Sequence, residues 1–134
     1  MDRKRIVLAD DHQELLQEIR QLLTPEFQVL RTVSDGLELL AAVRACKPDA
    51  VVSDIRMPGL NGLEACRQIV HEGLCGAAIL LTMYDDGQLV TKAIQAGVRG
   101  YVLKIDAGGE LIPALNSVLA GGTYHSSGVR RRME

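Results

Sequence analysis

Polar residues stand directly behind four short apolar runs of the sequence, and their types suggest one kind of chemistry. The runs end in Asp10-Asp11, Asp54, Thr82 and Lys104. Carboxylates brought close together repel one another or raise each other's pKa unless a cation shares the site. Because the possible ligands are oxygens, with no histidine or cysteine cluster, a hard ion such as Mg²⁺ is favoured over zinc.

A magnesium ion leaves one carboxylate available for chemistry. Mg²⁺ usually takes one or two carboxylates and completes its shell with water and phosphate oxygens. A remaining carboxylate beside the ion and a lysine is arranged to attack phosphorus and form an aspartyl-phosphate. Asp54 is the expected nucleophile, because the turn Met57-Pro58-Gly59 behind it leaves room for metal and phosphoryl group. Lys104 would neutralise charge on that group, and Thr82 would hydrogen-bond it.

Five apolar runs have the length of strands and alternate with stretches of helical period. The runs cover residues 5–10, 27–34, 49–54, 77–82 and 99–104. Near-continuous apolarity is typical of parallel strands that are covered on both faces. Apolar residues recur at helical spacing over 15–23, 39–43, 63–70, 89–94 and 111–119. The alternation predicts an α/β domain, with a doubly wound parallel sheet of five strands flanked by five helices.

Helix boundaries agree with this pattern. Asp35 with Glu38, and Asn61 with Glu64, have the spacing of a capping box. Three glycines stand where helices should end, at positions 73, 97 and 121. In an open α/β sheet the ligand site lies beyond the carboxyl ends of the strands, where the winding reverses. The polar strand ends are therefore expected to converge on one edge of the sheet.

Composition limits the class of protein. A chain of 134 residues is one ordinary domain, and the net charge of −2 argues against a general polyanion binder. With 47% hydrophobic residues but only 3% aromatics, the core must be aliphatic. No apolar run approaches the ~18 residues of a membrane span. The three cysteines show no CxxC spacing, which favours reduced, packed thiols in a cytosolic protein.

Four motifs together resemble the receiver domain of bacterial two-component response regulators. They are "VLADDH", "SDIRMPGLNGLE", "LLTMY" and "GYVLK", and the resemblance covers about residues 4 to 121. It implies a flavodoxin-like sheet with strand order 2-1-3-4-5. It also implies a regulatory phosphoacceptor in the cytoplasm, which catalyses only its own phosphorylation and dephosphorylation, and a sensor histidine kinase as its partner.

The resemblance assigns roles to individual residues. Asp54 would accept phosphate from a phosphohistidine and, with Asp10, Asp11 and the backbone carbonyl of Arg56, would bind Mg²⁺. Asp11 would contact the ion directly and Asp10 largely through water. Lys104 would hold the phosphoryl group. On phosphorylation two switch residues would move: Thr82 would approach the phosphate and Tyr101 would turn inward.

Two further residues are expected to set the lifetime of the phosphate. In the family, the positions two residues beyond the acceptor and two beyond the threonine border the path of the hydrolytic water. Here they are Arg56 and Tyr84, both large and neither able to activate water as a carboxylate would. A long-lived phosphorylated state is therefore predicted. The alternative is that both side chains point into solvent and have no effect.

The sequence of the C-terminal third is similar to that of one subgroup of the family. "AGVRGYVLK", "ELIPAL" and "AGGTYHSS" resemble the NarL/FixJ class, which carries a LuxR-type helix-turn-helix domain. The resemblance implies a receiver over residues 1–121, with 122–134 starting a linker to a DNA-binding domain absent from this chain. It also implies a possible homodimer on phosphorylation. The three arginines at 130–132 are too few for a nucleic-acid patch, so this fragment is not expected to bind DNA. A free-standing receiver remains an alternative.

Other functions fit these residues less well than a receiver does. A hydrolase of the haloacid dehalogenase type needs a second acid two residues after the nucleophile, where this chain has Arg56. A flavin carrier needs a phosphate-binding loop after the first strand, and "DDHQE" would repel phosphate. A receiver-like scaffold that is never phosphorylated stays open. Three simpler roles also stay open: Tyr101 as a packing residue, Thr82 as a helix cap and His12 as a solvated residue.

Overall fold

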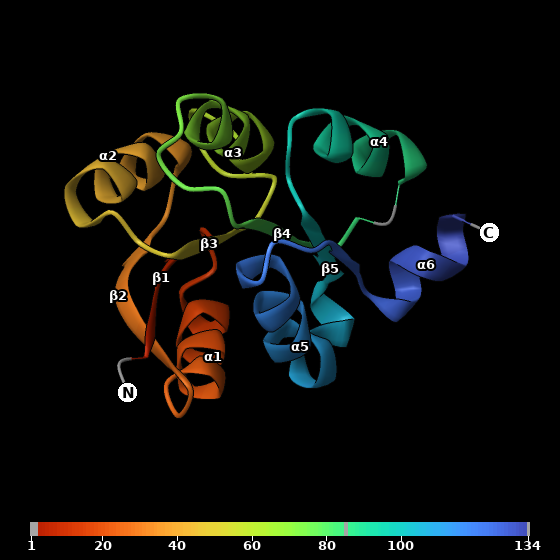
Figure 1. Ribbon diagram of the computed structural model, residues 1–134, viewed down its shortest axis with the longest axis horizontal. Coiled ribbons are helices and arrows are strands. Elements are labelled where there is room, and N and C mark those ends of the chain that lie inside the picture. Colours follow the sequence, from red (N-terminus) through yellow and green to blue (C-terminus); the bar gives the residue numbers. More distant parts are fainter. Residues whose placement is uncertain (1–2, 85, 134) are drawn as a thin grey trace.

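The apolar runs of the sequence form a parallel sheet. In the computed structural model, which describes residues 3–84 and 86–133, its strands are β1 (Lys4–Ala9), β2 (Phe27–Val33), β3 (Ala50–Ser53), β4 (Ala78–Thr82), β5 (Gly100–Leu103) and β6 (Tyr124–His125). The strands lie in the order β2-β1-β3-β4-β5-β6, and all neighbours pair in parallel (Figure 1). Every residue of β3, β4 and β5 is buried, as expected for strands that are covered on both faces.

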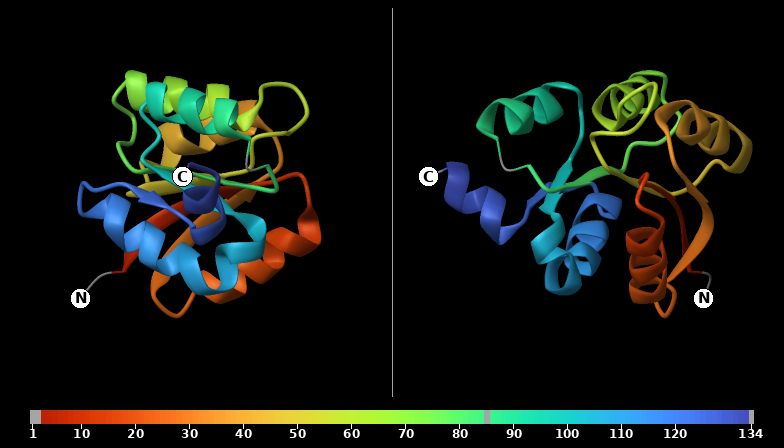
Figure 2. Two further views of the ribbon diagram at one scale, coloured as in Figure 1. Left: turned by 90° about the vertical axis from the view of Figure 1, so that its right-hand side faces the viewer. Right: turned by 180° about the vertical axis from the view of Figure 1, so that it is seen from behind.

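Helices cover both faces of this sheet. They are α1 (Gln13–Leu23), α2 (Gly36–Cys46), α3 (Gly62–His71), α4 (Gly87–Gln95), α5 (Ala107–Leu119) and α6 (Ser127–Met133), with a 3₁₀ turn over Lys104–Asp106. The views in Figure 2 show α2, α3 and α4 on one face, α1 and α5 on the other, and α6 beyond β5. The predicted doubly wound α/β class is confirmed. No helix within the described ranges is long and apolar enough to cross a membrane.

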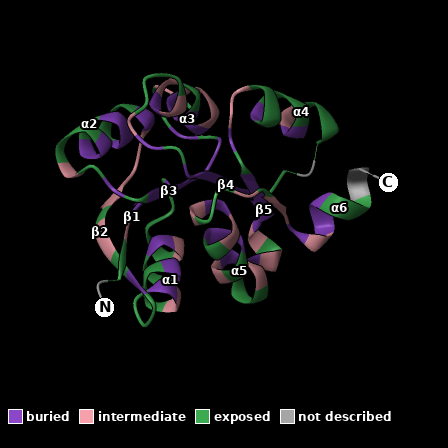
Figure 3. Ribbon diagram, in the orientation of Figure 1, coloured by how far each residue is buried: buried purple, intermediate pink, exposed green. Residues whose placement is uncertain are grey.

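Each face of the sheet has its own aliphatic core. Successive strand residues point to opposite faces. In β1, Ile6 and Leu8 therefore pack with α1 and α5, whereas Val7 and Ala9 pack on the side of α2 and α3. The buried stripes of the helices face the strands, as the purple segments in Figure 3 show. A core on both faces fixes the strands and so the positions of their ends.

The predicted helix boundaries are confirmed. Asp35 and Asn61 are the N-caps of α2 and α3, and their side chains accept hydrogen bonds from the backbone N–H groups of Glu38 and Glu64, each at 2.8 Å. The glycines after α3, α4 and α5 adopt φ values of 71°, 89° and 92°. This left-handed conformation costs least for a residue without Cβ, although Lys47 adopts it at the end of α2.

The predicted counts of five strands and five helices were each one short. Residues 124–133 form β6, which extends the sheet beyond β5, and α6, which packs against β5. Val129 of α6 is fully buried and belongs to the same core as Tyr101 and Leu103. A strand of two residues and a polar, basic helix leave no periodic pattern in the sequence, which is why the prediction missed them. The predicted linker start at 122–134 thus contains packed structure; its last residue, Glu134, lies outside the described ranges.

The three thiols are free, as predicted. Cys66 and Cys75 are buried and Cys46 is half-buried. Desolvation by burial, with a smaller contribution from Cys75, raises the pKa of Cys66 to about 12. A thiol that stays protonated is a poor nucleophile and metal ligand, so Cys66 serves as a packing residue.

Shortening Val129 tests whether α6 belongs to the folded domain. Val129→Ala should lower the free energy of unfolding by about 1–3 kcal/mol, because it removes buried methyl groups and leaves a cavity. The control is Ile105→Ala, since Ile105 is 84% exposed. This control should change stability by less than about 0.5 kcal/mol. Urea unfolding of both variants makes the measurement, and equal stabilities would show that α6 does not contribute.

Candidate functional site

Asp10, Asp54 and Lys104 meet at the carboxyl edge of the sheet. The Nζ atom of Lys104 lies 2.9 Å from Asp10 Oδ2 and 3.2 Å from Asp54 Oδ2. The other carboxylate oxygens are held by the backbone: Asp10 Oδ1 accepts from His12 N at 2.9 Å, and Asp54 Oδ1 from Ile55 N at 2.8 Å. Each carboxylate is thus fixed through one oxygen and presents the other to the same ammonium group.

The protonation equilibria of the site reflect this crowding. Desolvation, followed by the charge of Asp10, raises the pKa of Asp54, against the lowering effect of Lys104. For Lys104, burial alone would lower the pKa, but the two carboxylates outweigh it and raise the pKa. Lys104 is therefore firmly protonated, and the strand edge holds a cation between two anions.

The carboxylates at the end of β1 fit a hard cation. Ligand atoms of Asp10, Asp11 and His12 lie within 4.8 Å of one another, and the last two residues are exposed. Asp10 Oδ2 is buried, and within the described chain it accepts no well-oriented hydrogen bond, although it is close to Lys104. Besides its contact with the Lys104 ammonium group, a carboxylate oxygen can share a second lone pair, which a metal ion or a water bound to it could use. Carboxylate oxygens suit Mg²⁺.

The segment after Asp54 is held close to the strand by two glycines. Gly62 N donates to Ile55 O at 2.7 Å, and Gly36 N donates to Leu60 O at 3.1 Å. A Cβ on Gly62 would lie 1.7 Å from the carbonyl oxygen of Asp54, and one on Gly36 would lie 2.2 Å from that of Leu60. Only glycine fits at either place, so these contacts fix the path of the loop that contains Arg56.

The expected switch residues lie on the neighbouring strands. Thr82 is fully buried at the end of β4, and its Oγ1 accepts from Tyr84 N at 3.3 Å. Tyr101 is already turned inward, with 1% exposure, and its hydroxyl donates to Tyr84 O at 2.6 Å. The loop between β4 and α4 is therefore tied to both residues, which gives a change at Thr82 a physical connection to Tyr101.

Arg56 and Tyr84 lie against each other. The guanidinium carbon of Arg56 is 4.5 Å from the centre of the Tyr84 ring, within the range of a cation–π contact. Tyr84 keeps 38% of its surface exposed. The contact joins the loop after β3 to the loop after β4. Arg56 is exposed as well, so the two side chains meet at the surface of the domain.

Two residues near the site carried no recognisable signal in the sequence. Ser53, fully buried, donates its hydroxyl to the carbonyl oxygen of Asp54 at 2.8 Å. Ser126, also fully buried, contacts the residues on either side of Lys104. Serines are usually exposed, and nothing in the local pattern distinguishes a buried one. The burial of Ser126 depends on the sixth strand, which the pattern did not reveal.

Known proteins with a similar sequence and structure share one domain family. The family described as "Response regulator receiver domain" matches residues 6–116. The transcriptional regulatory protein DegU of Brevibacillus brevis is 34% identical over 90% of this chain and 52% of its own length. The DNA-binding transcriptional activator DevR/DosR of Mycobacterium tuberculosis is 35% identical over 87% of this chain and 55% of its own. The chain thus spans about half the length of these relatives.

A solved structure agrees over the whole fold. The crystal structure of a two-component response regulator of the LuxR family from Aurantimonas sp. SI85-9A1 has a TM-score of 0.89. It is 32% identical, and the match covers 99% of this chain and 100% of that one. The match therefore includes the C-terminal segment with β6 and α6.

The close approach at Gly62 can be tested by adding one methyl group. Gly62→Ala should lower the free energy of unfolding by about 2–3 kcal/mol, because the methyl group overlaps the Asp54 carbonyl and the loop must move. Gly109→Ala is the matched control, since a Cβ there meets nothing within 4 Å. Alanine should leave α5 as stable as before or up to about 1 kcal/mol more stable. If both variants were as stable as the wild type, the close approach of Gly62 to the Asp54 carbonyl would be contradicted.

Proposed function

Because the chain belongs to the family of response regulator receiver domains, we propose that it takes a phosphoryl group onto Asp54 from a phosphohistidine of a sensor kinase. The family resemblance seen in the sequence, including its LuxR-type character, is confirmed by the comparisons. The observation that carries the proposal is the pairing of Asp54 with Lys104 at 3.2 Å beside Asp10. Two carboxylates that share one ammonium group match the set needed for an aspartyl-phosphate.

In the proposed step, an oxygen of Asp54 forms a bond to phosphorus as the bond between phosphorus and the donor imidazole breaks. The bonding electron pair stays on the imidazole nitrogen. Asp54 must react as the carboxylate, and Lys104 supports this because its charge opposes the increase in the Asp54 pKa caused by burial and Asp10. Lys104 can then transfer its hydrogen bond from the carboxylate to a phosphoryl oxygen, where it offsets the transferred charge.

We propose that Mg²⁺ assists this step. Asp10, Asp11, Asp54 and the backbone carbonyl of Arg56 would hold the ion, with Asp10 acting largely through water. When bound, Mg²⁺ would neutralise charge on the phosphoryl oxygens. The chain's own residues supply the nucleophile and Lys104. The domain would catalyse its own phosphorylation and dephosphorylation and would not turn over other substrates.

The phosphorylated domain would act as a switch. Thr82 would exchange its contact with Tyr84 N for one with the phosphate, and the loop tied to Tyr101 would follow. Since Tyr101 is inward already, phosphorylation would stabilise this arrangement rather than create it, which is a shift of population. The surface that changes would be made by α4, β5 and α5.

In a longer protein, this switch would control transcription. DegU and DevR/DosR bear the names of transcription regulators, and DevR/DosR that of a DNA-binding one. By analogy, residues 1–121 would be the receiver and residues 122–134 would lead to a helix-turn-helix domain. This fragment would not bind DNA itself, and phosphorylation would favour a homodimer. Free thiols and a kinase partner would place the domain in the cytoplasm.

The phosphoacceptor can be identified by mass. Incubation with acetyl phosphate and Mg²⁺ should add one phosphoryl group to the wild type, and peptide mapping should locate it at Asp54. Asp54→Asn removes the nucleophile at constant size and should receive no label at this position. Asp35→Asn, a matched change of a capping aspartate, should be phosphorylated like the wild type. A label on another residue in the wild-type protein would refute the assignment.

The metal site can be tested through charge removal. Asp11→Ala should weaken Mg²⁺ binding roughly tenfold or more, because a ligand and a negative charge are lost from the site. Glu14→Ala removes an equal, exposed charge from the first turn of α1 and should leave binding close to that of the wild type. Titration of each protein with Mg²⁺ makes the comparison. Equal affinities for the two variants would place the ion elsewhere.

The contact between Arg56 and Tyr84 should lengthen the life of the phosphate. We expect the double variant Arg56→Asn, Tyr84→Glu to lose its phosphoryl group roughly tenfold faster than the wild type, equivalent to about 1.4 kcal/mol of barrier. In this proposal the stacked pair covers the phosphoryl group on Asp54, and the double change would remove that cover and add a carboxylate that can orient water. Arg44→Asn, at an exposed arginine in α2, is the control. A double variant that dephosphorylates at the wild-type rate or slower would contradict the prediction.

A further inference from the structure

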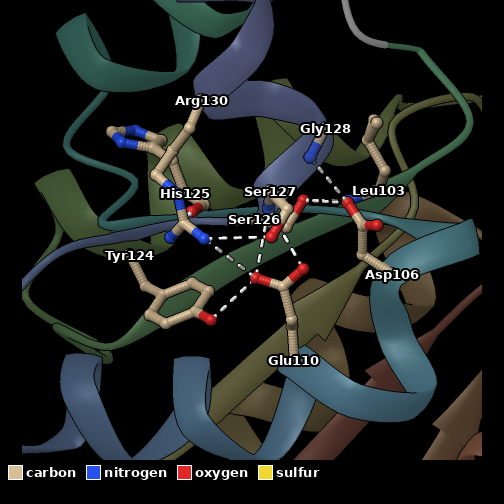
Figure 4. Close-up of polar contacts among 9 residues, drawn as sticks. All are labelled: Leu103, Asp106, Glu110, Tyr124, His125, Ser126, Ser127, Gly128 and Arg130. Atoms are coloured by element: carbon tan, nitrogen blue, oxygen red, sulfur yellow. Dashed lines mark hydrogen bonds and ion pairs between the residues drawn. The ribbon is translucent and has the colours of Figure 1, made fainter.

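A buried serine connects the C-terminal segment to the backbone that carries Lys104. Ser126 Oγ accepts from Leu103 N at 3.0 Å and donates to Asp106 Oδ2 at 2.7 Å (Figure 4). Leu103 precedes Lys104 and Asp106 follows it by two residues. One hydroxyl group therefore bridges the two ends of the 3₁₀ turn on which the active-site lysine sits.

The serine hydroxyl continues the sheet where its last strand stops. Ser126 N donates to Tyr101 O at 3.0 Å, which is the final backbone contact along the β5–β6 pair. The next donor on β5, Leu103 N, is buried, and the side chain of Ser126 takes the place of a backbone acceptor. A buried N–H group without a partner is costly, so this contact holds the end of β5 in place.

Asp106 extends the connection into α6. Its Oδ2 atom also accepts from Gly128 N, in the first turn of α6, at 3.0 Å. Gly128 lies so close that an added Cβ would be 2.4 Å from Leu103 Cδ1 and 3.1 Å from Asp106 Oδ2. The turn, the serine and the start of α6 are therefore in direct contact, and a side chain at position 128 would not fit.

We propose that Ser126 and Asp106 are positioning residues for Lys104, and that through them the state of Asp54 is linked to α6. This inference rests on the proposed phosphorylation of Asp54. When Lys104 exchanges Asp54 for a phosphoryl oxygen, the turn that carries it must adjust, and Asp106 with Ser126 passes that change to α6. The connection runs through β5 and α6 and does not need the loop that joins Thr82 to Tyr101.

Coupling of this kind works in both directions. If the phosphoryl group alters the contacts of α6, then α6 must alter the free energy of phosphoryl or phosphate-mimic binding by the same amount. The segment after residue 121 is then part of the working site, and a change made in it should be measurable at Asp54.

Glu110 provides a matched control within the same cluster. It accepts from Tyr124 Oη at 2.8 Å and from Ser127 N at 3.1 Å, and it pairs with Arg130 at 3.5 Å. These contacts hold β6 and α6 on α5, as Figure 4 shows, but none of them involves the turn around Lys104. Glu110→Ala should therefore loosen α6 without moving the lysine directly.

The first test compares rates of phosphorylation by acetyl phosphate in Mg²⁺. Ser126→Ala and Asp106→Ala should be slower than the wild type by roughly three- to tenfold, since a misplacement of ~1 Å can cost about a hundredfold. The phosphorylation rate of Glu110→Ala should stay within about twofold of the wild-type rate, because this change should displace Lys104 less. Asp106→Asn should be phosphorylated at close to the wild-type rate. One oxygen of Asp106 accepts both hydrogen bonds, and an amide oxygen can replace it. Circular dichroism at the assay temperature shows whether each variant is folded.

The second test follows backbone amide signals by NMR while beryllofluoride, a phosphate mimic, is added. In the wild type the signals of Leu103 and of residues 126–130 should shift. In Asp106→Ala the shifts of 126–130 should disappear, and in Glu110→Ala they should remain. Hydrogen exchange of the Leu103 amide, measured without metal or mimic, should be faster in Ser126→Ala than in Glu110→Ala.

The outcomes separate this inference from the proposed function. If the wild type is phosphorylated at Asp54 but Ser126→Ala, Asp106→Ala and Glu110→Ala all react at its rate, the positioning role is refuted. Shifts at 126–130 that persist in Asp106→Ala would refute the link to α6. If the wild type accepts no phosphoryl group at Asp54, the proposed function itself fails. The exchange of the Leu103 amide then still tests whether Ser126 holds the turn around Lys104.

Discussion

Two buried carboxylates at the edge of the sheet share a single ammonium group, that of Lys104. Asp10 is 2% exposed and Asp54 is 6% exposed, so neither charge is well solvated by water. Charges of equal sign at such a site are unfavourable unless a cation lies between them. The lysine supplies that cation: from the turn after β5, it contacts Asp10 behind β1 and Asp54 behind β3. The architecture of the site follows from this requirement.

The fold meets the requirement through rigid supports. The cores on both faces of the sheet fix β1, β3 and β5, and parallel pairing brings their carboxyl ends to the same edge. Beyond the strands, the loops are held by contacts that leave no spare room. Gly62 lies against the carbonyl of Asp54, and Ser126 bridges the turn around Lys104. Charged groups that must lie within about 3 Å of each other need this support, because small displacements weaken electrostatic and hydrogen-bond contacts steeply.

The sequence predicted those parts of the molecule that have a strong local pattern. The apolar runs located the first five strands to within a residue or two, and capping pairs such as Asp35 with Glu38 marked the helix starts. The convergence of Asp10, Asp54 and Lys104 followed from the topology. The sixth strand and helix were missed, since two residues have no period and Tyr124, His125 and Ser126 look like a polar loop. The stacking of Arg56 on Tyr84 was not predictable either, because it depends on how two loops approach each other in space.

The central claim is that Lys104 pairs with Asp54 in the resting domain and transfers to the phosphoryl group when Asp54 is modified. A crystal structure of the protein with Mg²⁺ and beryllofluoride tests it most directly. The account predicts beryllofluoride bonded to Asp54 Oδ2, with Lys104 Nζ moved from its present 3.2 Å contact with that oxygen to a fluorine of the adduct. An adduct on another residue, or a lysine that keeps its pair of carboxylates and does not touch the adduct, would contradict it.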